Sequence, residues 1–133
     1  MSEWLAKGIE LLADDAGSGP AASKGDRVTY NARLFLRRGD EVTQDGRSIA
    51  AYRDRLPLRV IGGVELIDHR TELGKRQPIA AVEKSLLGMQ AGGYREVLAS
   101  AHLCYGRRGL PGVIPADAML RIELWLQAIE ADR

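Results

Sequence analysis

The sequence predicts an α+β fold in which an antiparallel β-sheet wraps over one short helix. Residues 26–36 and 119–129 alternate apolar and polar side chains at the two-residue period of a half-buried strand. Residues 79–89 instead repeat apolar side chains at the helical spacing of 3.6 residues. Strands and helices do not alternate along the chain as they do in βαβ folds, so we expect the strands to pair antiparallel.

The N-terminal third is expected to contain one long strand. Residues 1–13 alternate loosely, which leaves an edge strand and a helical turn equally open. Residues 16–23 are rich in Gly, Pro and Ser and indicate a loop. In the strand at 26–36, one face carries Val28, Tyr30, Ala32 and Leu34, and the other carries Thr29, Asn31 and Arg33. A turn at residues 38–40 then leads into a short return strand at 41–43.

The middle of the chain is predicted to form a polar loop and then a hairpin. The loop covers residues 44–57, which Gly46 and Pro57 interrupt. Residues 58–61 are expected to form a strand, Gly62 and Gly63 a tight turn, and residues 64–73 the partner strand. Gly74 would close that hairpin.

One helix and two more strands complete the prediction. Pro78 suits the first turn of a helix, and Gly88 or the pair Gly92–Gly93 would end it. The apolar face of this helix consists of Ile79, Val82, Leu86 and Met89. A strand at 95–99, a Gly- and Pro-rich loop at 105–116 and a final strand follow. The apolar face of that final strand consists of Leu120, Ile122, Leu124 and Leu126.

Length and composition fit one globular domain spanning residues 1–133, with 45% apolar and 28% charged residues. The net charge of +1 provides no strong field toward nucleic acid or anionic lipid, so neither is expected as a partner. The N-terminus lacks the features of a secretion signal, and no apolar run approaches the roughly 20 residues that span a bilayer. The single cysteine, Cys104, fits a reducing compartment and is expected to be a small buried side chain. These features favour a cytoplasmic protein.

Three stretches, in order, resemble the FKBP-type peptidyl-prolyl isomerase family. The first runs from Lys24 to Val28 and continues to the Arg38-Gly39-Asp40 turn. The second contains Leu73-Gly74 and Pro78-Ile79 and ends in Leu87-Gly88-Met89-Gln90-Ala91-Gly92. The third is the loop from Tyr105-Gly106 to Pro111-Gly112-Val113-Ile114-Pro115. The resemblance implies an antiparallel half-barrel curled around one helix, with an apolar pocket that binds proline-containing polypeptides. It implies no cofactor and no metal.

The resemblance also assigns roles to individual residues. Tyr105 matches the tyrosine whose hydroxyl donates a hydrogen bond to the bound peptide, and Ile79 matches the position whose backbone N–H donates to a peptide carbonyl. Val113 and Ile114 match the apolar wall of the pocket, and Leu110 would form a soft lid. His69 and His102 stand apart from other ligand types, so we expect no metal site.

Several pocket positions depart from the family pattern. Ala32 stands where the family has a tyrosine, Val42 and Ile122 where it has phenylalanines, and Val82 where it has a tryptophan. Thr43 replaces an aspartate that accepts a hydrogen bond across the pocket. Phe35 is out of phase with the pocket face of its strand and does not compensate. Because every replacement is smaller, the substitutions predict a pocket that is either wider or filled by another part of the chain, and reduced isomerase activity.

The chain is longer than the compact family pattern between Thr43 and Leu73, by roughly one hairpin that includes Tyr52, Leu58 and Val60. This insertion would be a surface hairpin that extends the sheet, a cover over the pocket, or a surface for a client protein. The leading hypothesis is therefore a weak or narrowly specific prolyl isomerase. The alternative is a non-catalytic binding module that uses the same groove or the hairpin. The sequence leaves the oligomeric state open.

Overall fold

Two long strands, β4 (Arg27–Leu36) and β11 (Leu120–Glu130), form the centre of the fold. In the computed structural model, which describes residues 3–43, 57–75 and 79–131, they pair antiparallel from Leu120 opposite Leu36 to Glu130 opposite Arg27. The alternation in β11 has the predicted effect, because one face is fully buried and consists of Leu120, Ile122, Leu124 and Leu126. The two strands therefore supply much of the hydrophobic core.

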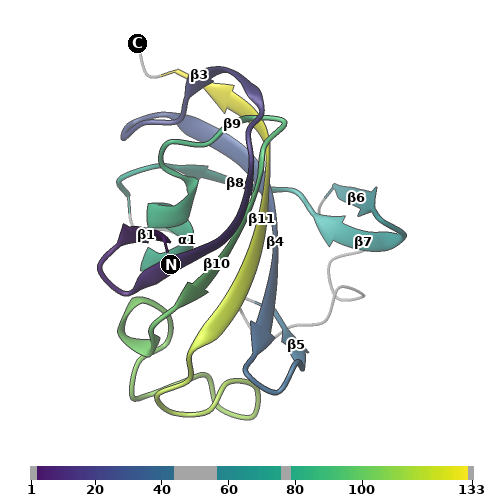
Figure 1. The fold of residues 1–133 in the computed structure, drawn as a ribbon. Coiled ribbons are helices and arrows are strands. Elements are labelled where there is room, and N and C mark those ends of the chain that lie inside the picture. Colours follow the sequence, from purple (N-terminus) through teal and green to yellow (C-terminus); the bar gives the residue numbers. More distant parts are fainter. Residues whose placement is uncertain (1–2, 44–56, 76–78, 132–133) are drawn as a thin grey trace.

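The main sheet has seven strands and is antiparallel, and its strands come from both ends of the chain. Its order is β1-β2-β10-β11-β4-β5, and β8 also pairs with β4 (Figure 1). Beyond β4 and β11, these strands are β1 (Glu3–Ala6), β2 (Ile9–Asp15), β5 (Glu41–Val42), β8 (His69–Glu72) and β10 (Tyr94–Ala99). Residues 1–13, which the sequence left open, thus provide strands in the part that is described.

Helix α1 (Ala80–Leu86) lies against one face of this sheet, as expected for an α+β half-barrel (Figure 1). Its buried side chains are Ala81, Val82, Ser85 and Leu86. The helix is shorter than the apolar periodicity suggested, because Leu87 leaves the helical conformation at φ −59°, ψ 130° and Gly88 follows at φ +87°. Met89 is buried but lies beyond the helix. Pro78 falls outside the described residues.

The predicted loop at residues 16–23 is partly wrong. Residues Ser18–Ala21 form β3, which pairs with β9 (Gln90–Ala91) in a separate two-stranded sheet. Backbone hydrogen bonds extend this contact, because Ala22 donates to the Met89 carbonyl at 2.7 Å and Gly88 donates to the Ala22 carbonyl at 2.9 Å. The segment therefore closes the end of the half-barrel beyond the helix.

The hairpin after residue 57 exists, but its second strand is shorter than predicted. Strands β6 (Leu58–Ile61) and β7 (Val64–Ile67) pair around the Gly62–Gly63 turn and project from the sheet face opposite α1 (Figure 1). The chain does not continue as one strand to Leu73. It changes direction at Asp68, and β8 then pairs with β4 in the main sheet. The predicted loop at residues 44–57 lies outside the described residues except for Pro57, which directly precedes β6.

Candidate functional site

Ile79 is half-buried and occupies the N-cap position at the start of α1. Ile79 has extended backbone angles, φ −60° and ψ 152°, and its carbonyl accepts hydrogen bonds from Val82 at 3.0 Å and Glu83 at 3.1 Å. Within the described segments, no acceptor is in range of the Ile79 N–H, as is usual for a donor at a helix start. The predicted N–H donor is therefore compatible with the local geometry.

The loop that carries Tyr105 is held in shape by its own backbone. Gly109 N–H donates to the Tyr105 carbonyl at 3.0 Å, and Gly106 N–H donates to Ala101 at 2.8 Å. Further along, Leu110 and Ile114 exchange two backbone hydrogen bonds of 2.8 Å. Such internal bonding fixes the positions of the side chains on both sides of the loop before any peptide arrives.

The predicted site residues fall into two groups by exposure. Val82 and Ile122 are 0% exposed and Ile114 is 4% exposed, so all three belong to the hydrophobic core. The apolar half-buried group packs against this same core and consists of Ala32, Val42, Ile79, Tyr105, Leu110 and Val113. Thr43 directly follows β5 and is also half-buried. Val82, Ile114 and Ile122 are therefore closed off from solvent, whereas each side chain of the half-buried group keeps part of its surface exposed.

Phe35 lies on the other side of the sheet from the predicted pocket. It is 7% exposed, and the guanidinium groups of Arg33 and Arg121 lie 5.0 Å and 4.1 Å from the centre of its ring. On this outer face, Arg33 forms a bidentate pair with Glu41 at 2.8 and 2.9 Å. Hydrogen bonding to Glu41 raises the pKa of Arg33. Arg121 pairs with Glu96 at 2.5 Å. Phe35 thus supports a charged outer face and does not contribute to the predicted pocket.

The sequence did not predict the polar cluster that anchors the β6–β7 hairpin. The Asn31 side chain is 0% exposed, and it donates to the Ile67 carbonyl at 2.8 Å and to Asp68 at 2.6 Å. Arg59 binds the Asp68 carboxylate through two hydrogen bonds of 3.0 and 3.1 Å, which lower the pKa of Asp68. Gln127 completes the cluster by donating to the Asn31 carbonyl oxygen at 2.9 Å. The hairpin is therefore fixed to the outer face of β4.

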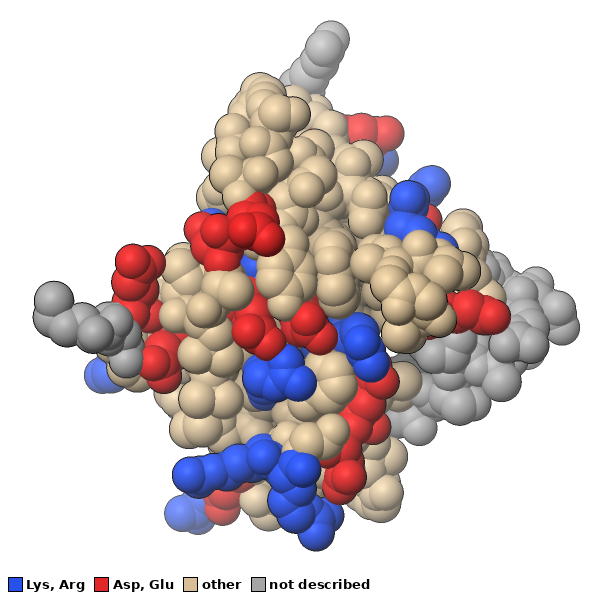
Figure 2. Space-filling model, turned by 45° about the vertical axis from the view of Figure 1, so that its right-hand side comes forward, with Lys and Arg blue, Asp and Glu red and all other residues tan. Residues whose placement is uncertain are grey.

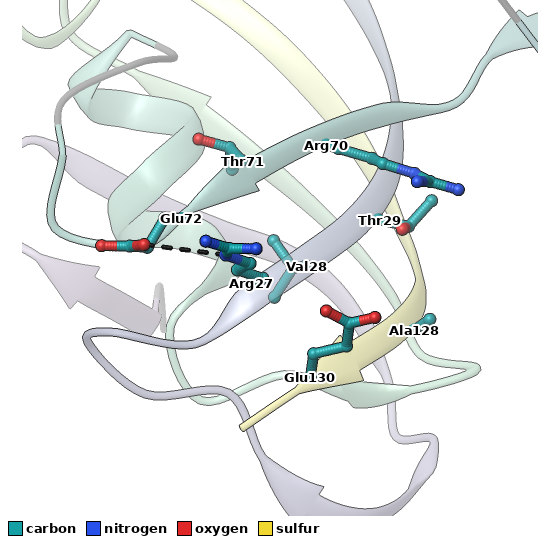
Figure 3. A pocket seen from close by; sticks show the side chains of 8 residues that line it. All are labelled: Arg27, Val28, Thr29, Arg70, Thr71, Glu72, Ala128 and Glu130. Carbon is teal, nitrogen blue, oxygen red and sulfur yellow. Dashed lines mark ion pairs between the residues drawn. The ribbon is translucent and has the colours of Figure 1, made fainter. Parts of the chain in front are cut away.

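A separate surface hollow of about 450 Å³ lies at the far end of β4, lined by side chains of β4, β8 and β11. Figure 3 shows that Arg27 turns toward Glu72, its ion-pair partner at 3.8 Å, whereas Arg70 extends away from both. The Thr71 hydroxyl points toward the helix. These groups do not converge on one point, so the hollow offers no arrangement that would hold a particular ligand.

The residues that the structure describes form neither a metal-binding cluster nor a membrane-spanning helix. Among residues 3–43, 57–75 and 79–131, no three His, Cys, Asp or Glu side chains gather closely enough to hold a metal ion. In the same segments, no helix has the length and apolar character needed to cross a bilayer. Cys104 is half-buried rather than fully buried, and it packs against the core.

Burial makes Cys104 a poor nucleophile, because it raises the pKa of the thiol to about 11. Only the thiolate reacts, so we expect alkylation by iodoacetamide at pH 7.5 to be about 100-fold slower in the folded protein than in urea. The alkylation rate of the folded protein should keep rising with pH up to about 11. The alkylation rate of the unfolded protein should instead level off near the ordinary pKa of a thiol. Equal rates at pH 7.5 would contradict the burial of this thiol.

Comparisons with known proteins agree with this arrangement. The profile of the "FKBP-type peptidyl-prolyl cis-trans isomerase" family matches residues 19–127. The chain is 31% identical to FK506-binding protein 1A of Neurospora crassa over 92% of this chain and 89% of that protein. It is 44% identical to FK506-binding protein 4 of Gibberella zeae, over 95% of this chain but only 22% of that longer protein. It is also 48% identical to peptidyl-prolyl cis-trans isomerase FKBP11 of Bos taurus, over 44% of this chain and 29% of that protein.

Solved structures show the same fold at low sequence identity. The N-terminal domain of FKBP42 from Arabidopsis thaliana matches with a TM-score of 0.74 and 17% identity, over 98% of this chain and 93% of that one. A peptidyl-prolyl cis-trans isomerase from Pseudomonas syringae matches with a TM-score of 0.71 and 19% identity, over 98% and 81% of the two chains. The family profile covers both the helix start at Ile79 and the Tyr105 loop. Because it matches most of the sequence, this chain belongs to the FKBP-type peptidyl-prolyl cis-trans isomerases.

Proposed function

We propose that this chain catalyses the cis–trans isomerisation of X–Pro bonds in polypeptides. One observation carries the proposal. In a chain of a prolyl isomerase family, the helix that starts at Ile79 and the loop that presents Tyr105 pack against the same hydrophobic core. The proposal requires neither a nucleophile nor a cofactor.

The reaction is limited by the resonance of the amide bond. Rotation about a peptide bond has a barrier of about 18–20 kcal/mol, and X–Pro bonds isomerise unaided in tens to hundreds of seconds. At the top of the barrier the amide loses its resonance and much of its charge separation. An apolar site therefore disfavours the planar amide relative to the twisted one and lowers the barrier.

The chain's own residues would hold the peptide while the bond rotates. Tyr105 would donate its hydroxyl hydrogen to a carbonyl of the peptide, and the Ile79 N–H would donate to another. Val42, Leu110 and Val113 would surround the proline ring with half-buried apolar surface. Two fixed donors on either side of the ring would orient the peptide so that only the X–Pro bond turns.

We propose that the activity is low. Aliphatic side chains at positions 42, 82 and 122 offer less contact area than the aromatic residues that the family pattern has there. Each loss of about 1.36 kcal/mol in the stabilisation of the transition state slows a reaction tenfold, so two or three such losses slow it about 100- to 1,000-fold. Turnover well below that of a typical family member is the expected consequence.

Replacing Tyr105 with phenylalanine is expected to lower kcat/KM for an X–Pro tetrapeptide by about 3- to 10-fold, the value of one hydrogen bond. The measurement is NMR exchange between the cis and trans peptide, without a coupled protease. Tyr94→Phe is the matched control, because the Tyr94 hydroxyl bonds Glu123 at 2.6 Å on the outer face of the sheet. Equal rates for the two variants would contradict the role of Tyr105.

A second candidate function is binding without catalysis, through the β6–β7 hairpin. Its base is held by Asn31 and Asp68, while Val60 near its turn is 66% exposed. The two functions differ in which amide resonances respond. An X–Pro peptide that shifts Ile79, Tyr105 and Val113 supports isomerase binding. A binding partner that shifts only residues 57–67 supports the second function.

A further inference from the structure

Two arginines in the Tyr105 loop lack the carboxylate partners that most other described arginines have. Arg107 and Arg108 are both exposed, and no carboxylate of the described residues lies within ion-pair distance of either. The paired arginines and their partners are Arg27 with Glu72, Arg33 with Glu41, Arg38 with Asp40, Arg59 with Asp68, Arg95 with Asp14, and Arg121 with Glu96. Among the described residues, no carboxylate neutralises these two adjacent cations, so both can interact with a charge on a bound peptide.

The loop holds these two cations close to the candidate site. They occupy the turn closed by the 3.0 Å hydrogen bond from Gly109 N–H to the Tyr105 carbonyl. A second bond, from Asp117 N–H to the Gly106 carbonyl at 2.9 Å, ties the same turn to the end of the loop. Because Tyr105 precedes Arg107 by two residues, a peptide carbonyl bound by its hydroxyl would place neighbouring peptide residues near both guanidinium groups.

Other exposed basic side chains lie near the same end of the molecule. The turn between β4 and β5 and the loop before β11 lie at the lower end of the molecule in Figure 1. Lys and Arg gather at this lower end on the face shown in Figure 2. Of the carboxylates in these two segments, Asp40 is engaged by Arg38 and Glu41 by Arg33, and Asp117 is exposed. Arg37 contributes a further exposed cation to the β4–β5 turn.

We propose that Arg107 and Arg108 make this site select proline-containing peptides that carry acidic residues beside the X–Pro bond. The inference rests on the proposed isomerase function and names its substrate class. The net charge of the whole chain is only +1, so the selection is local to this loop and does not come from long-range attraction. Because both side chains are exposed, salt should weaken the selection.

The test compares peptides that share the same X–Pro bond but carry two Glu, two Gln or two Lys residues in flanking positions. We expect kcat/KM for the Glu peptide to exceed that for the Lys peptide about 5-fold at low salt, and less than about 2-fold at 0.5 M salt. The variant Arg107→Gln/Arg108→Gln should remove this ratio. The matched control, Arg27→Gln/Arg70→Gln, removes two cations at the other end of β4, and it should keep the ratio. Counted along β4 from Leu36, which lies opposite Leu120 at the end of the loop, Arg70 is about 23 Å away and Arg27 about 30 Å away.

The outcomes separate this inference from the proposed function. Isomerisation of all three peptides at equal rates, or a ratio that survives the loop variant, would overturn the role of Arg107 and Arg108 and leave the isomerase function intact. Failure to isomerise any of the peptides would remove the isomerase function and, with it, the substrate class. Salt dependence of the ratio in the unmodified protein gives a second measurement that does not depend on any variant.

Discussion

Replacing Arg95 with alanine is expected to reduce the free energy of unfolding by about 3 kcal/mol. Arg95 is 8% exposed, and its Nη1 donates to the carbonyls of Ser85 at 2.9 Å and Leu87 at 3.1 Å. These carbonyls belong to the end of α1, where no further helical N–H is available to them. The alanine variant would leave the buried Ser85 carbonyl and the partly buried Leu87 carbonyl without this donor and remove a cation from the negative end of the helix dipole.

The contribution of the helix end can be separated from that of the ion pair. Arg95 also binds Asp14 at 3.1 Å, but the Asp14 side chain is 40% exposed, so its pair with Arg95 should contribute less than about 1 kcal/mol. Urea unfolding of Arg95→Ala and Asp14→Asn therefore gives a direct comparison. We expect the thermal midpoint of the alanine variant to fall by about 10 °C. Equal losses for the two variants would show that the helix carbonyls find other donors.

Replacing Gly109 with alanine is expected to disturb the Tyr105 loop more than any other small change there. Gly109 has φ +62°, and a Cβ at this position would lie 2.3 Å from the Ile114 carbonyl oxygen and 2.8 Å from the backbone of Pro115. Both the left-handed backbone and the contact with main-chain atoms are unfavourable, with a combined cost of about 2–4 kcal/mol. The loop must shift, and with it Tyr105, whose carbonyl accepts the Gly109 N–H.

Gly112→Ala is the matched control for this change. Gly112 has φ +77°, but a Cβ there would meet no atom within 4 Å, so only the backbone cost of about 1 kcal/mol applies. We expect kcat/KM to fall more than 10-fold in Gly109→Ala, because catalysis depends on donor placement within about 1 Å, and to change little in Gly112→Ala. Similar losses of activity and stability in the two variants would show that the loop tolerates the contact with Ile114 and Pro115.

Local sequence patterns predicted the structure correctly where one face of a strand or helix is buried against the core. The alternation from Leu120 to Leu126 predicted both the strand and its buried face. The turn at Gly62–Gly63 predicted the hairpin around it. The helix was placed correctly but extended too far, because Met89 is apolar and in phase with Leu86 even though the chain leaves the helix before it. Burial alone does not distinguish a helical residue from the residue after a helix end.

Sequence periodicity gave wrong predictions where other segments of the chain pack against both faces of a strand. Asn31 was assigned to a polar outer face, yet it is fully buried because the hairpin base returns over β4 and Asp68 meets its side-chain amide. The run from Val64 to Leu73 read as one strand, but it divides at Asp68 between two sheets. No period in the sequence records a partner that lies 37 positions away.

The sequence by itself determined the class of the fold and the order of the motifs that tie this chain to its family, because alternation, glycine turns and loop composition are local properties. The tertiary structure alone decided which polar side chains are buried, which arginines have partners, and that Val82 and Ile122 are fully buried while other candidate site residues are only half-buried. Burial and ion pairing depend on which distant segments pack together, and hydrophobic packing across the whole sheet determines that choice.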